Sequence, residues 1–256
     1  MPRSETIESK PTIAVRIRRI AEMTGLFWTV LLGRSKDPIE GIQVYDILAR
    51  WLGRGDHQML TRMCALEQGR RLLDERQDVL GPLTDRKALQ AMPDGSVGRA
   101  LVRFLEEREI YPEELARKVR EARADSGGFA PGASPEVAYL HDRFRDLHDL
   151  WHVVTGYDND WAGEYGVVAF SAQQVGYRSQ TLATGVSSLI ASIGGRPDVM
   201  RTWIEARRRA QRAPYLLAED WPALLPLPLA QVRDQLGLLP MPVYRPLPNT
   251  GYRSAA

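Results

Sequence analysis

Apolar residues recur along most of this chain at intervals of three and four, which is the spacing of one face of an α-helix. Between residues 96 and 109, for example, Val97, Leu101, Phe104 and Leu105 form one stripe. Nowhere does the alternation of apolar and polar residues persist as a half-buried β-strand requires. The pattern predicts an all-α fold in a single helical domain, with helices over residues 12–33, 38–53, 56–70, 96–109, 112–124, 135–155, 165–177, 179–194, 198–212 and 229–236 and a short one that begins at residues 84–85.

Capping residues predict where several of these helices begin or end. Asp56 and Asp160 are predicted N-caps, because a short carboxylate side chain accepts from the free amides of a first turn. Pro112 suits a first helical position. Gly156 is predicted to end the helix that starts near residue 135, since glycine adopts the left-handed conformation found beyond many helix ends.

Composition divides the chain into three predicted regions, with a polar first segment and a proline-rich last one. Residues 1–11 are expected to be a flexible leader, without the apolar segment of a secretory signal. Residues 12–240 are expected to form the helical domain, and residues 241–256 a loose, proline-rich tail. The Gly-rich loop over residues 126–134 precedes the helix with the candidate site described below, so it is a candidate lid.

Two uncharged stretches are candidates for lipid or partner contacts. Residues 25–33 are apolar but span only about half of the ~20 residues that a transmembrane helix needs. A core or dimer-contact helix is the favoured interpretation, and an interfacial helix with Trp28 at the headgroup level is the alternative. Residues 179–194 also carry no charge. They are predicted to be a central buried helix or to line an apolar channel.

Composition narrows the function classes. The 256 residues are 44% hydrophobic and 26% charged, which is ordinary for a globular protein. The 34 basic and 32 acidic residues nearly cancel, so no net field favours nucleic acid. Cys64 is the single cysteine and lies in an apolar run, so we predict a core residue in a reducing compartment rather than a nucleophile or a disulfide.

The strongest candidate chemistry is a metal site. His148 and His152 are four residues apart, so a helix presents both on one face. Asp149 lies between them in the sequence, and Glu164 would fall in the first turn of the next helix and could fold back over the pair. Two imidazoles with one or two carboxylates suit Zn²⁺ or a similar divalent ion. The alternative is a polar patch without any metal.

Other polar residues near this motif are candidates for a proton donor or for ligands of a different ion. His141 is nearly two turns before His148, about 10 Å away on an ideal helix, and would be a proton donor, a partner of a ligand or a plain surface residue. Asp158 and Asp160 could recruit a harder ion such as Mg²⁺ or Ca²⁺.

The pattern His148-Asp149-x-x-His152-x11-Glu164 resembles the metal motif of the coenzyme Q (ubiquinone) biosynthesis protein 4 family. Weaker similarity lies at residues 92–98, in the lead-in at residues 143–147 and at residues 219–221, so that the resemblance covers roughly residues 20 to 240. It implies a metal-dependent, oxidative C1-decarboxylation of a polyprenylated 4-hydroxybenzoate-type intermediate. By this resemblance His148, Asp149, His152 and Glu164 are the catalytic residues and the ligands of the metal, with Zn²⁺ as the expected ion.

The resemblance also implies partners. A prenylated quinone-precursor lipid would need an apolar groove, for which residues 24–33 and 179–194 are the candidates. The proton donor for the reaction is left open among Asp142, Asp146, His141 and Tyr165. Other ubiquinone-biosynthesis proteins are expected as partners, at the cytoplasmic surface of a bacterial inner membrane. Exposed amphipathic helices favour a homodimer.

Two other functions remain open at this point. The protein could be a non-catalytic scaffold that binds prenyl lipids, with a fully coordinated structural ion. It could also be a zinc metallohydrolase, since HDxxH is one methylene shorter than HExxH. The Arg-rich run at residues 201–212 is expected to be a solvated face, with a site for an acidic lipid headgroup as the alternative.

Overall fold

The computed structural model describes residues 55–126, 134–240 and 244. The predicted leader, the helices over residues 12–33 and 38–53, most of the candidate lid loop and nearly all of the tail lie outside these residues. The uncharged run at residues 25–33 lies outside them too.

The described parts of the chain are helical and form a single all-α domain without strands, as the periodicity predicts. In these parts, no helix combines the length and the apolar character needed to cross a bilayer. The elements are α3 (Asp56–Ala65), α4 (Glu67–Glu75), α5 (Leu80–Thr84), α6 (Arg86–Ala91), α7 (Val97–Glu107), α8 (Pro112–Ser126), α9 (Pro135–Asp146), α10 (His148–Thr155), α11 (Trp161–Val175), α12 (Arg178–Ile193), α13 (Pro197–Arg212), the 3₁₀ turn η1 (Leu216–Ala218), α14 (Trp221–Leu224) and α15 (Leu229–Gln235).

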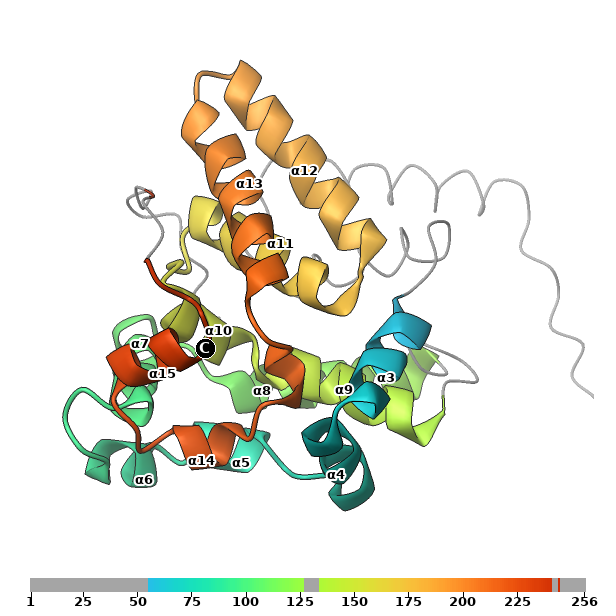
Figure 1. Cartoon of the computed structure of the whole chain (residues 1–256), viewed down its shortest axis with the longest axis vertical. Helices are drawn as coiled ribbons and strands as arrows, with labels where there is room; N and C mark the ends of the chain where they lie inside the picture. Colours follow the sequence, from blue (N-terminus) through green and yellow to red (C-terminus); the bar gives the residue numbers. More distant parts are fainter. Residues whose placement is uncertain (1–54, 127–133, 241–243, 245–256) are drawn as a thin grey trace, which may run out of the picture.

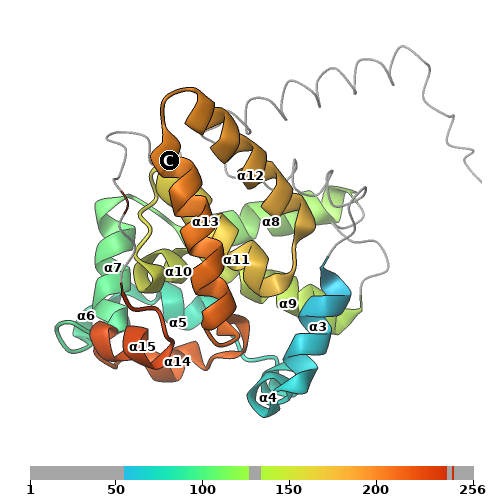
Figure 2. The ribbon, with the colours of Figure 1, turned by 45° about the horizontal axis from the view of Figure 1, so that its top comes forward.

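Helices α11, α12 and α13 pack on one another, and α12 and α13 form an antiparallel pair that extends from the rest of the domain (Figure 1). Helix α10 lies beneath this group and packs against α7, α9, α11 and α15. Turning the molecule keeps α10 between α7 and α11 (Figure 2). The short α10 is therefore central to the fold.

Helix α10 is central because its sequence is apolar around much of its circumference, as in helices enclosed by others. Leu150, Trp151 and Val154 are all fully buried. His152 is also buried, at 2% exposure, so one of the two motif histidines sits inside the core rather than on its surface.

Two predicted helices are each divided in the structure. The helix predicted over residues 56–70 is interrupted at Leu66, which is extended (φ −103°, ψ 135°). The one predicted over residues 135–155 is interrupted at Leu147 (φ −83°, ψ −8°). Neither site carries a glycine or proline. Leu147 is fully buried, so tertiary packing rather than a local helix breaker sets its backbone.

Two predictions about α3 are wrong. Asp56 is the first residue of the helix and makes no capping hydrogen bond, because the N-cap position falls on Gly55. Cys64 is exposed and not in the core. The core face of α3 carries Met59 and Met63, both fully buried, and the next residue is rotated by about 100° away from that face.

Candidate metal centre

The turn between α10 and α11 sets the positions of the site residues. Gly156 ends α10 in the left-handed conformation (φ 81°), as predicted. Asp160 caps α11 by accepting from the amide of Ala162, also as predicted. Glu164 consequently lies in the first turn of α11, where it faces back toward α10.

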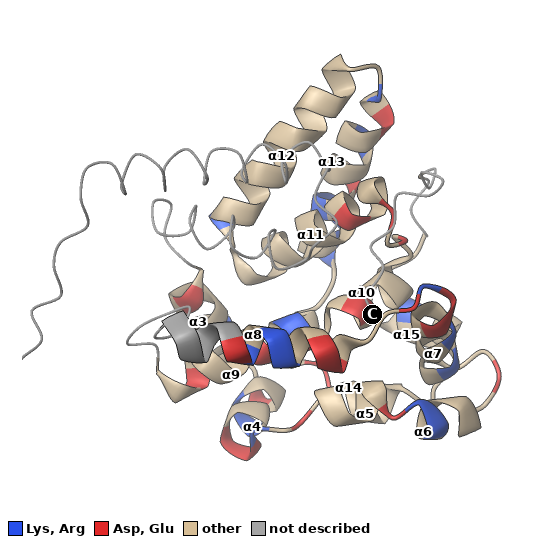
Figure 3. Cartoon of the chain, turned by 180° about the vertical axis from the view of Figure 1, so that it is seen from behind, with Lys and Arg blue, Asp and Glu red and all other residues tan. Residues whose placement is uncertain are grey.

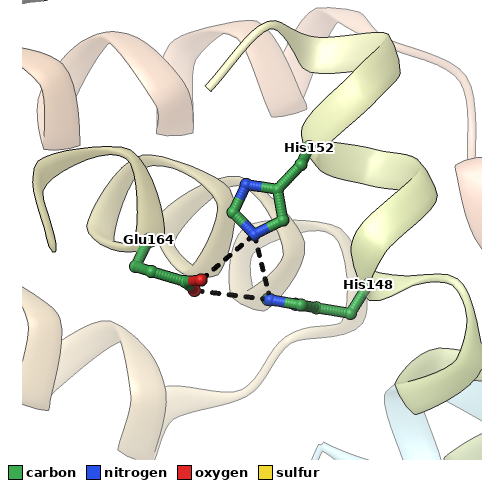
Figure 4. A group of neighbouring side chains, drawn as sticks. All are labelled: His148, His152 and Glu164. Atoms are coloured by element: carbon green, nitrogen blue, oxygen red, sulfur yellow. Dashed lines mark hydrogen bonds and ion pairs between the residues drawn. The ribbon is translucent and has the colours of Figure 1, made fainter. Parts of the chain in front are cut away.

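His148, His152 and Glu164 converge (Figure 4). The two Nε2 atoms are 3.2 Å apart. Glu164 reaches both imidazoles, with Oε2 at 3.3 Å from His148 Nε2 and Oε1 at 3.3 Å from His152 Nε2. Within the described residues, these three form a group whose ligand atoms all lie within 4.8 Å of one another.

These separations fit a divalent metal. Tetrahedral zinc with ligands at ~2.0–2.1 Å places its ligand atoms roughly 3.3 Å apart. The Nε2–Nε2 separation of 3.2 Å matches that value, as do the two separations of 3.3 Å, from His148 Nε2 to one carboxylate oxygen of Glu164 and from His152 Nε2 to the other. Three protein ligands leave a fourth position for water or substrate, as in catalytic zinc sites.

The electrostatics of the group also suit a cation. Burial alone would raise the pKa of Glu164, but the charge of His152 and hydrogen bonds from both imidazoles lower it to about 2. Burial would lower the pKa of His152, yet the charge of Glu164 raises it above its ordinary value. A buried carboxylate thus needs a positive partner here, and a proton on His152 or a metal ion can supply the charge.

The ring of His152 is fixed by its surroundings. Its Nδ1 lies 2.9 Å from the carbonyl oxygen of Tyr157 and donates to it, so Nε2 is left to bind an ion. Phe104 of α7 stacks on the imidazole, with ring centroids 5.4 Å apart and 22° between the planes. Spacing along the sequence gave no sign of either Phe104 or Tyr157.

Asp149 is not in the three-residue group of ligand atoms, although the sequence places it between the histidines. The pKa of Asp149 is raised above its ordinary value, because the effect of burial exceeds that of the charges of His148 and His152, which lower it. Its carboxyl group is therefore close enough to both imidazoles to interact with them electrostatically, from beside the group.

His141 belongs to a separate cluster. Its Nε2 lies 3.0 Å from Asp56 Oδ1, and its Nδ1 lies 2.8 Å from the hydroxyl of Tyr177. The continuous helix that would have stacked it on the face of His148 is absent, because the interruption at Leu147 separates α9 from α10. Its partners come instead from α3 and from the turn before α12.

The other acidic residues of the motif region have structural partners. Asp158 accepts from Arg108 Nε at 2.7 Å, and Asp160 caps α11 and accepts from the hydroxyl of Tyr244 at 2.9 Å. The same tyrosine oxygen also accepts from the amide of Asp158 at 2.5 Å. A tyrosine beyond residue 240 thus holds the loop between α10 and α11, a role that its proline-rich context did not indicate.

The candidate proton donors lie outside the three-residue group. Asp142 and Asp146 each bind Arg145, at 2.7 Å. Tyr165, one residue after Glu164, packs against Trp161 with ring centroids 4.9 Å apart. Burial raises the pKa of Tyr165.

The fold and site define an all-helical protein with a candidate His₂Glu metal centre between two consecutive helices. A family model described as coenzyme Q (ubiquinone) biosynthesis protein Coq4 matches residues 56–242. The match covers more than half of the chain and includes every residue of the candidate centre. The chain belongs to this family, as the motif predicted.

Individual relatives agree. The chain is 28% identical over 191 residues to the mouse (Mus musculus) protein named "Ubiquinone biosynthesis protein COQ4 homolog, mitochondrial". That match covers 68% of this chain but only 62% of the mouse protein. The cattle (Bos taurus) protein of the same name is 26% identical over 255 residues, which cover 91% of this chain and 90% of the relative.

A solved structure shows the same fold. The crystal structure of a protein from Nostoc punctiforme PCC 73102 that is named for ubiquinone biosynthesis superposes with a TM-score of 0.61. The match covers 88% of this chain and 98% of that chain, at 17% sequence identity. At this identity the likeness concerns the fold alone.

Proposed function

We propose that His148, His152 and Glu164 hold a catalytic divalent metal, with Zn²⁺ as the ion, and that the protein removes the C1 carboxyl group of a polyprenylated 4-hydroxybenzoate-type intermediate. The observation that carries the proposal is the set of 3.2–3.3 Å separations among the two imidazole Nε2 atoms and the two carboxylate oxygens of Glu164. Membership in the Coq4 family supports ubiquinone biosynthesis as the setting.

The three ligands differ in exposure, which indicates where substrate approaches. The side chain of His152 is 1% exposed and that of Glu164 is 15% exposed, whereas that of His148 is 33% exposed. Substrate would therefore enter on the side of His148. When bound, the metal ion would act as a Lewis acid toward the carboxylate or ring oxygens of the substrate.

Residues of the chain orient the imidazole of His152 and set the charge at the site. Tyr157 holds His152 in one tautomer through its carbonyl oxygen, and Glu164 supplies negative charge beside the bound substrate. Cleavage of the bond between C1 and the carboxyl carbon releases CO₂ and leaves an electron pair at C1. A proton must take that position, or, in the oxidative version, a hydroxyl group, with two electrons passing to an oxidant such as O₂.

A mainly apolar cavity of about 540 Å³ lies between α11, α12 and α13 and supports binding of the prenyl tail. Leu182, Leu189 and Trp203 line it, and the first two are half exposed. Apart from Arg178 at its start, α12 has no charged residue (Figure 3). The three candidate ligands do not line this cavity. We therefore propose that only the tail lies on α12 and that the head group extends from there to the metal centre.

The activity is tested by incubating the zinc-loaded protein with a prenylated 4-hydroxybenzoate and measuring CO₂ release and the decarboxylated product by mass spectrometry. We expect turnover by the wild type and none by Glu164→Gln, which preserves shape but removes the charge. Equal turnover by both proteins would refute a catalytic role for the metal centre.

A non-catalytic lipid-binding scaffold is a second candidate, which the half-exposed leucines of α12 favour. It would keep lipid binding but show no turnover, and its metal would be structural, so that ligand variants unfold. Substituting Leu182→Asp and Leu189→Asp tests the tail site in either case: prenyl-lipid binding should fall about tenfold or more, and undiminished binding would exclude this cavity.

We also propose that the protein associates with a membrane surface from the cytoplasm, contacts other ubiquinone-biosynthesis proteins and forms a homodimer. These proposals rest on the family and on the apolar surface of α12. Sedimentation of the protein with anionic vesicles, and its mass in solution by light scattering, test the first and the last of these.

A further inference from the structure

Helix α10 ends with carbonyl groups that the helix itself cannot pair. The last turn of any α-helix leaves its carbonyl oxygens without intrahelical amide donors. In α10 the amide of Gly156 donates to His152 O at 2.9 Å. The carbonyl oxygens of Val153, Val154 and Thr155 remain, and all three residues are buried. Unpaired carbonyls in the core would be destabilising, so their partners matter.

Two arginines from distant helices supply these partners. Arg233 of α15 donates from Nη2 to Val153 O at 2.7 Å and from Nε to Val154 O at 3.2 Å. Arg209 of α13 donates from Nη1 to Thr155 O at 2.9 Å. Together they pair every carbonyl of the last turn that the helix leaves open.

The two guanidinium groups share this place despite their mutual repulsion. Arg209 is only 8% exposed. Burial lowers the pKa of Arg233, and the charge of Arg209 lowers it further. What offsets the repulsion is the negative end of the α10 dipole, where positive charge is favourable. Arg208, the neighbour of Arg209 on α13, is exposed instead, so the buried placement is specific to the arginine that meets α10.

This end of α10 is linked to the metal centre through Tyr157. The guanidinium carbon of Arg209 lies 5.4 Å from the centroid of the Tyr157 ring. The carbonyl oxygen of Tyr157 accepts from His152 Nδ1. Since α10 has only eight residues, it is too short to be stable without tertiary contacts, and its orientation depends on what holds its ends.

We infer that Arg209 and Arg233 are positioning residues that clamp the C-terminal end of α10 and thereby hold His148 and His152 in register with Glu164. The inference rests on the metal centre proposed above. It extends that proposal to two residues from other helices that are not in the group of candidate ligands. The Arg-rich run predicted as a solvated face is thus divided between an exposed Arg208 and a buried, structural Arg209.

The clamp is tested first in the metal-free protein, by hydrogen–deuterium exchange of the α10 segment. We expect Arg209→Met and Arg233→Met to increase exchange in residues 148–156 at least tenfold, with a smaller change in α7 as the reference for global opening. Arg208→Met is the matched control and should leave both segments unchanged. If the α10 and α7 segments respond equally, or neither responds, the clamp is refuted, whatever metal the protein binds.

Metal affinity then tests the consequence for the site. By competition with a chromophoric chelator, both Met variants should bind Zn²⁺ about tenfold or more weakly than the wild type, as is usual when groups that orient ligands are removed. Arg233→Lys should recover only part of this loss, because one ammonium cannot reproduce the fork that spans two carbonyls. Affinities equal to that of Arg208→Met would refute the positioning role.

These two experiments separate the inference from the proposed function. A wild type that binds no Zn²⁺ would refute the metal centre, and with it the role of the arginines in positioning ligands. The exchange data would still decide whether the arginines hold α10. Exchange specific to α10, together with unchanged zinc affinity, would contradict the link between clamp and site while leaving the metal centre intact.

Discussion

Gly163 packs directly on the carbonyl oxygen of Asp158: a Cβ at position 163 would lie 1.9 Å from that oxygen. It would also lie 2.8 Å from the carbonyl carbon and 2.9 Å from the amide nitrogen of Asp158. All three are backbone atoms, which cannot turn aside as the end of a side chain can. The loop between α10 and α11 closes this tightly only with glycine immediately before Glu164.

Gly163→Ala should therefore disturb both stability and the site. We expect a loss of about 1–3 kcal/mol in the free energy of unfolding, typical of overpacking, measured by urea denaturation. Because the first turn of α11 must shift, Zn²⁺ affinity should fall as well.

Gly194→Ala is the matched control, since a Cβ there would meet its nearest atoms at an ordinary 3.4 Å. Its stability should stay within about 0.5 kcal/mol of wild type. A Gly163→Ala protein as stable as this control would contradict the close packing of the loop.

Metal affinity should depend on pH through His152. The pKa of Glu164 is lowered to about 2, so this carboxylate is ionised throughout the neutral range. The pKa of His152 is raised above its ordinary value, and a metal must displace that proton. Zn²⁺ affinity should fall as the pH decreases through the pKa of His152, with release of a proton on binding.

Competition titrations between pH 5.5 and 8 and calorimetry in buffers of different ionisation enthalpy measure these two effects. Affinity that is constant over this range, without proton release, would contradict a role for His152 as a ligand.

Asp149→Asn distinguishes a ligand from a neighbouring charge. With His148, His152 and Glu164 in place, the variant should still bind one Zn²⁺ per chain at saturation. Its affinity should be lower by about tenfold, because a negative charge beside the site is removed. A loss of zinc as complete as in Glu164→Gln would instead make Asp149 a ligand, as the family motif implies.

The thiol of Cys64 should react in the native protein. It is exposed, while Met59 and Met63 face the core. One thiol per chain is expected to react with Ellman's reagent without denaturant. Reaction only after unfolding would show that the residue is buried after all.

Local sequence signals predicted much of the site. The i,i+4 spacing put both histidines on one helical face, Gly156 ended that helix, and Asp160 capped the next. Each of these depends on neighbours within a few residues, where spacing and backbone preference decide the structure. The same reasoning predicted an all-α domain and the resemblance that the family match confirms.

Contacts between residues far apart in the sequence determine the features of the site that sequence patterns did not predict. The interruption at Leu147 has no glycine or proline to mark it, yet it redirects His141 to Asp56 and away from the metal centre. Phe104 reaches His152 from α7, across nearly fifty residues of sequence. Arg209 looked like a member of a solvated run because helical periodicity does not show which carbonyls a distant helix leaves open.

The metal content of the purified protein shows whether His148, His152 and Glu164 hold an ion. Wild type and the His148→Ala variant are prepared without chelators and measured by inductively coupled plasma mass spectrometry, with melting curves for both. We expect close to one zinc per chain in the wild type, and little in a variant that still melts cooperatively. A wild type without metal, or a variant that retains it, would contradict the assignment of His148, His152 and Glu164 as a metal centre.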